Sequence, residues 1–133
     1  MEAYEWLIGR GINGLYYCPI GVDDNPYAIP DYRFGVETDY LTIILKGGII
    51  SLALLLMIAI PAIIKGIFQS KNLLSKAAGI WILLWMINLY PTTVTTFTLN
   101  YALVWISIGI CYSIEIRNLS DEFLVSYFRK AKT

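Results

Sequence analysis

The longest apolar run of the chain, residues 41–64, limits what the chain can fold into. It carries a single charge, Lys46, close to its start. At about 1.5 Å per residue, a helix over this run is longer than the roughly 30 Å hydrocarbon core of a bilayer. Hydrophobic residues make up 57% of the sequence, more than a soluble domain of this size can bury. The sequence therefore predicts an integral membrane protein.

Two shorter apolar segments follow the first run. We expect a second span at about 77–97, as a helix that either continues past Pro91 or breaks there inside the protein, and a third span at 99–116. The fold class predicted is all-α, with about three transmembrane helices.

The tail, residues 117–133, is basic, and its large apolar residues recur at helical spacing. This pattern predicts a short amphipathic helix on the cytoplasmic surface. Residues 1–40 differ in composition from the rest of the chain, because glycines, prolines and tyrosines recur throughout them. They are expected to form a loop with turns.

Acidic and basic residues are divided along the chain. All the acids except Glu115, Asp121 and Glu122 lie in residues 1–40, and all the bases except Arg10 and Arg33 lie after them. Loops that keep Lys and Arg face the cytoplasm. We therefore expect residues 1–40 on the periplasmic or extracellular face of a bacterial inner membrane, and the connection 65–76 and the tail in the cytoplasm.

The sequence lacks the residues and motifs that several kinds of site require. The sequence has no histidine, no paired-cysteine or HExxH metal motif and no phosphate-binding GxxxxGK[ST] loop. Cys18 lies in a polar segment and Cys111 in an apolar one, so they are not expected to pair. We therefore expect no metal, no nucleotide cofactor and no nucleic-acid partner.

Three segments carry a resemblance to a known family. They are IGRGING at residues 8–14, YRFGVETDYL at 32–41 and LKGGIISLALLL at 45–56, followed by two more spans and a basic tail. This layout resembles the C-terminal part of the O-antigen polymerase and O-antigen ligase superfamily. The ligase pattern of a histidine followed by spaced glycines is matched only at Gly48, and Glu37 stands where its histidine would be. The resemblance therefore favours the polymerase branch.

The resemblance implies a glycosyltransferase activity. The expected reaction transfers glycan from an undecaprenyl-diphosphate carrier to a sugar acceptor at the periplasmic face. Members of the family have more spans, so we expect the chain to be a C-terminal portion that needs missing N-terminal spans, or other polysaccharide-assembly proteins, for activity. Membrane lipid and the lipid-linked glycan are the other expected partners.

Five residues are candidates for the site. Arg33 and Arg10 have planar guanidinium forks suited to a diphosphate. Arg33 could instead pair with Asp31 or Glu37, and Arg10 could be an exposed charge in a glycine turn. Glu37 is the candidate catalytic base and Asp39 a candidate substrate-binding residue, although both also suit the start of a helix. Tyr32 is a candidate for stacking on sugar, or for holding the loop together.

Two other functions stay open from the sequence. The chain could be a non-catalytic small membrane subunit that packs its helices against a larger partner. It could also be a fragment of a lipid or ion transporter.

Overall fold

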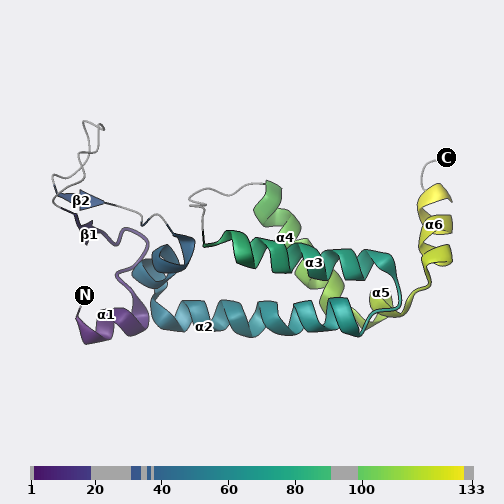
Figure 1. Cartoon of the computed structure of the whole chain (residues 1–133), viewed down its shortest axis with the longest axis horizontal. Coiled ribbons are helices and arrows are strands. Elements are labelled where there is room, and N and C mark those ends of the chain that lie inside the picture. The colour runs from purple at the N-terminus through teal and green to yellow at the C-terminus, as the bar shows by residue number, and fades with distance from the viewer. Residues whose placement is uncertain (1, 19–30, 34–35, 37, 91–98, 131–133) are drawn as a thin grey trace. The chain divides into compact units, whose positions relative to one another are not determined.

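The computed structural model describes residues 2–18, 31–33, 36, 38–90 and 99–130 (Figure 1). This part of the chain is mostly helical, as expected, with six helices and one pair of two-residue strands. The chain divides into two compact units. The first comprises Met1–Leu56 and Asn88–Thr96, and the second Met57–Ile87 and Phe97–Thr133.

The first unit begins with a helix, α1 (Ala3–Ile8), where a loop was expected. The backbone N–H of Glu2 donates to Glu5 Oε2 at 2.8 Å, which stabilises the first turn. The helix ends at Gly9, whose φ of 76° and N–H bond to the Glu5 carbonyl stop it. A helix this short shows no apolar periodicity, so the sequence pattern missed it.

A small hairpin follows in the same unit. Strand β1 (Tyr16–Tyr17) pairs antiparallel with β2 (Tyr32–Arg33), so that Tyr16 lies opposite Arg33 and Tyr17 opposite Tyr32. The Tyr17 and Tyr32 rings meet edge to face with centroids 5.6 Å apart. Two distant parts of the expected loop are therefore joined.

Helix α2 (Asp39–Phe68) contains the predicted first span and extends beyond it at both ends. Within the described residues it is the one helix long and apolar enough to cross a membrane. It is not continuous, because Gly48 has φ 72° and ψ 179° and interrupts the helical backbone. Its residues up to Leu56 belong to the first unit and those from Met57 to the second.

The other two apolar helices are shorter than the predicted spans. Helix α3 (Leu73–Asn88) begins before residue 77 and ends before Pro91, and residues 91–98 lie outside the described part of the chain. Helix α4 (Leu99–Tyr112) stops inside the apolar run expected at 99–116. It stops there because Ser113 caps a new helix, α5 (Ile114–Asn118), by accepting the Ile116 N–H at 3.3 Å.

Small residues let the helices of the second unit approach closely. A Cβ added to Gly66 of α2 would lie 2.6 Å from Cys111 Sγ of α4 and 3.0 Å from Gly79 Cα of α3. Ile82, Val104 and Cys111 are fully buried in this unit. Such close approach through small residues is typical of helices packed in membranes.

The predicted C-terminal helix is present as α6 (Asp121–Lys130), with acids in its first turn and bases in its last. Leu73 N–H donates to Asp121 Oδ1 at 2.8 Å, which ties the start of α6 to the start of α3. Phe123, Val125 and Tyr127 of α6 are exposed.

Candidate functional site

The break in α2 is covered by a turn from the N-terminal segment, which we call the Gly–Arg–Gly turn (residues 9–11). A break in a helix frees the carbonyls of the turn before it. Two of these carbonyls accept new hydrogen bonds: Arg10 N–H donates to the Leu45 carbonyl at 2.7 Å, and Gly11 N–H donates to the Lys46 carbonyl at 2.9 Å. The turn thus supplies donors that the interrupted helix no longer provides.

Glycine is required on both sides of this contact. Gly9 has φ 76°, and a Cβ on it would lie 2.5 Å from the Lys46 carbonyl oxygen. A Cβ on Gly48 would overlap the Leu7 carbonyl at the end of α1. Figure 1 shows α1 beside the bend in α2. The structure therefore brings together two of the segments that carry the family resemblance, residues 8–14 and 45–56.

The side chain of Arg10 stabilises the N-terminal segment through two interactions. Nη2 lies 2.9 Å from Glu5 Oε2, and Nη1 donates to the Leu15 carbonyl at 2.7 Å. The hydrogen bond from Arg10, with a second from the Glu2 N–H, lowers the pKa of the Glu5 carboxyl below its ordinary value of 4.5. A lowered pKa means that the bond stabilises the folded chain at neutral pH and is lost as the pH falls through that pKa.

Arg33 lies in β2, and none of the described acids pairs with it. Its Nε is buried and has no hydrogen-bond partner, and within the described residues it forms no ion pair. The predicted pairing with Asp31 is therefore absent there, and Glu37 lies outside the described residues. A buried guanidinium N–H without an acceptor is energetically unfavourable, so an acceptor at this position would stabilise it.

Tyr32 and Asp39 occupy different settings. Tyr32 is exposed beside Arg33 in β2, with Tyr17 against one edge of its ring. Asp39 is 4% exposed, and its N–H donates to the Leu89 carbonyl at 3.1 Å. Its position in the first turn of α2 agrees with the helix-terminal role that the sequence also allowed.

The sequence pattern did not reveal the contributions of Glu5, Gly9 and Gly48. The spacing of Glu2 and Glu5 is the signal that could have indicated the cap of α1. No local signal connects Gly9 with Gly48, because the two are far apart in the chain.

Arg10, Tyr32, Arg33 and Asp39 are the sequence-predicted site residues that the structure describes in the first unit. Within the described residues, no group of three or more His, Cys, Asp or Glu could hold a metal ion. Comparisons of the chain with protein-family models, with curated proteins and with solved structures found no match.

Proposed function

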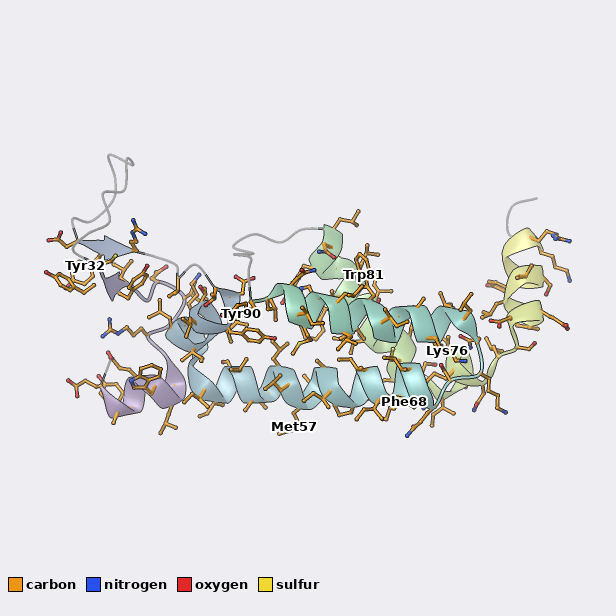
Figure 2. All side chains as sticks on the ribbon, in the orientation of Figure 1. Tyr32, Met57, Phe68, Lys76, Trp81 and Tyr90 are labelled. Carbon is orange, nitrogen blue, oxygen red and sulfur yellow. The ribbon has the colours of Figure 1, made fainter. Side chains whose placement is uncertain are left out.

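We propose that the chain is a multi-pass protein of the bacterial inner membrane, which it crosses with α2, α3 and α4. Large apolar side chains are exposed along all three helices, among them Met57 at 67%, Ile87 at 60% and Ile106 at 58%. Figure 2 shows Met57 on α2. So many exposed apolar side chains would be unfavourable in water and are ordinary in lipid. The shorter helices α3 and α4 would span with tilt or local thinning of the bilayer.

The bases suggest the orientation. Lys65 and Lys71 lie at the connection between α2 and α3, and Arg129 and Lys130 end α6. By the positive-inside rule these segments face the cytoplasm, and α1 and the hairpin face the periplasm.

Single cysteines test this orientation. We expect an impermeant maleimide, added to intact cells, to label Ile12→Cys and not Gln69→Cys, with Cys18 and Cys111 replaced by alanine in both. Both positions are exposed, so accessibility within the protein does not limit labelling. Permeabilised cells are the control, because both cysteines should then react. Labelling of Gln69→Cys alone in intact cells would show that the orientation is inverted.

We also propose that the first unit belongs to a polysaccharide polymerase acting at the periplasmic face. The observation that carries this proposal is the Gly–Arg–Gly turn bonded to the break in α2, because it joins two segments that resemble the O-antigen polymerase superfamily. The same unit contains Arg33, which forms no ion pair with any described residue, and the start of α2. Further membrane spans would complete the site.

The proposed reaction needs a cation and a base. The acceptor hydroxyl oxygen attacks the anomeric carbon of the donor sugar, and the bond from that carbon to the diphosphate oxygen breaks. Undecaprenyl diphosphate leaves with the electron pair, and the hydroxyl proton passes to a carboxylate, for which Glu37 is the candidate. Arg33 would stabilise the charge that develops on the diphosphate, and Tyr32 would contact a sugar ring.

A non-catalytic membrane subunit is the second candidate. It is favoured by the interactions of Arg10, which pairs with Glu5 and donates to the Leu15 carbonyl. These interactions give Arg10 a structural role. In that case α2, α3 and α4 would pack against a larger partner.

The variant Arg33→Lys separates the two candidates. For the polymerase, we expect polymer formation to fall by about tenfold or more, because lysine keeps the charge and loses the planar fork. An exposed arginine of α6 supplies the matched control, since Arg129→Lys should leave polymer unchanged. The measurement is the polysaccharide chain-length distribution on a gel at matched protein level. A wild-type ladder from Arg33→Lys would remove the reason for placing the diphosphate at Arg33.

A further inference from the structure

In the second unit, the connection between α2 and α3 is fastened to α5. Asn72 Nδ2 donates to the carbonyls of Ile116 at 2.6 Å and Leu119 at 3.2 Å. Lys71 N–H donates to the Arg117 carbonyl at 2.9 Å. We call residues 69–72 and 116–119 the clasp. Its bonds hold Arg117 against the end of α2.

Arg117 is a buried charge in this clasp. The residue is 8% exposed, Nη1 donates to the Gln69 carbonyl at 3.3 Å, and Nε has no hydrogen-bond partner among the residues that the structure describes. An arginine stays charged in proteins, and burying a charge is unfavourable unless an opposite charge compensates it. A bound anion would therefore compensate the buried charge of Arg117 in the clasp.

The nearest acids in the sequence do not supply this anion. Glu115 is exposed, and Asp121 uses Oδ1 to accept the Leu73 N–H. No carboxylate in the described part of the second unit lies within 4.0 Å of the Arg117 guanidinium. Lys71, whose backbone N–H donates to the Arg117 carbonyl, is another base and is exposed.

We propose that the clasp binds the phosphate of an anionic phospholipid from the cytoplasmic leaflet. Nε and one Nη of a guanidinium form a fork that matches two oxygens of a phosphate, and Lys71 adds a second cation at the rim. Bases at the cytoplasmic ends of spanning helices attract anionic lipids. Figure 1 shows α5 at the end of α2, next to the start of α3. The inference rests on the proposed membrane insertion, and it is independent of the proposed transferase activity.

Lipid titration of the purified full chain in detergent tests the site. We expect phosphatidylglycerol to raise the melting temperature and phosphatidylcholine to leave it unchanged. Arg117→Gln should bind phosphatidylglycerol about tenfold more weakly, the size of effect typical of one lost charge-assisted hydrogen bond. Lys76→Gln removes the same charge from an exposed residue of α3 and should bind within about twofold of the wild type.

The outcomes distinguish the possible explanations. Equal weakening in both variants would show general charge attraction and overturn the site. Saturation by inorganic phosphate, with no additional effect of phosphatidylglycerol, would overturn the lipid as ligand. If Arg117→Gln does not fold, Arg117→Lys replaces it, with several-fold weaker binding expected and wild-type binding contradicting the proposal. Carbonate extraction of membranes tests insertion separately, so its failure is distinguishable from failure of the site.

Discussion

Replacing Gly48 with alanine is expected to lower the free energy of unfolding by about 2 kcal/mol or more. The residue has φ 72° and ψ 179°, a backbone conformation that side chains other than glycine rarely adopt. The new methyl group would also overlap the Leu7 carbonyl. Relief of both strains would pull the Gly–Arg–Gly turn away from the Leu45 and Lys46 carbonyls. Thermal unfolding in detergent, followed by tryptophan fluorescence, measures the loss.

Two glycine variants are matched controls for Gly48→Ala. Gly11 has φ 82°, and no other atom lies within 4 Å of its Cβ position, so Gly11→Ala should show only the backbone strain, about 1 kcal/mol. Gly109 lies in α4 with no atom that close, and Gly109→Ala should be neutral or stabilise by about 0.5 to 1 kcal/mol. If Gly48→Ala costs no more than Gly11→Ala, the turn does not pack on the break as described.

Replacing Asn72 with alanine is expected to cost about 2 to 4 kcal/mol. The side chain is fully buried, and it accepts the Ser75 N–H at 2.8 Å while donating to the Ile116 and Leu119 carbonyls. Alanine would remove the cap of α3, leave the Leu119 carbonyl without the Asn72 donor, and leave the Ile116 carbonyl with only the Leu119 N–H. The clasp would open, and Arg117 would lose its fixed position. Chemical or thermal unfolding of the purified chain measures the effect.

Asn72→Asp separates the role of this side chain as an acceptor from its role as a donor. Aspartate can still accept the Ser75 N–H, but at neutral pH it cannot donate to the carbonyls of Ile116 and Leu119. We expect it to destabilise the chain at least as much as alanine does. Asn118 is an exposed residue of α5, and Asn118→Ala should change the free energy of unfolding by no more than about 0.5 kcal/mol. Equal effects at positions 72 and 118 would show that the clasp contributes nothing.

The apolar runs determined where the long helices form. Residues 41–64 lie within α2, and the predicted amphipathic tail is α6. The acids at one end of the chain and the bases at the other indicated its proposed orientation. These features could be predicted because hydropathy, charge and helical periodicity are properties of neighbouring residues.

Helix ends and breaks depended on particular hydrogen bonds. Ser113 ends the third apolar run by capping α5, although the residues on both sides of it are apolar. Gly48 lies inside the predicted first span, and its non-helical backbone interrupts the helix there. The glycine pair at 47–48 does not reveal which of the two breaks the helix. The N-terminal turn decides this, because its N–H groups satisfy the carbonyls that the break exposes.

The candidate site was predicted as residue types, and only the tertiary structure shows which partners its described residues have. The sequence by itself determined that Arg10 and Arg33 lie in a glycine-rich, acidic segment before the first span. The folded chain gave Arg10 a partner in Glu5, whereas Arg33 Nε is buried and has no partner in the described part of the chain. It also buried Arg117, which the sequence showed as one base of a cationic tail. The physical reason is that an arginine's partner is set by the carboxylates and carbonyls that distant segments bring within hydrogen-bond reach, whereas hydropathy acts on each segment locally.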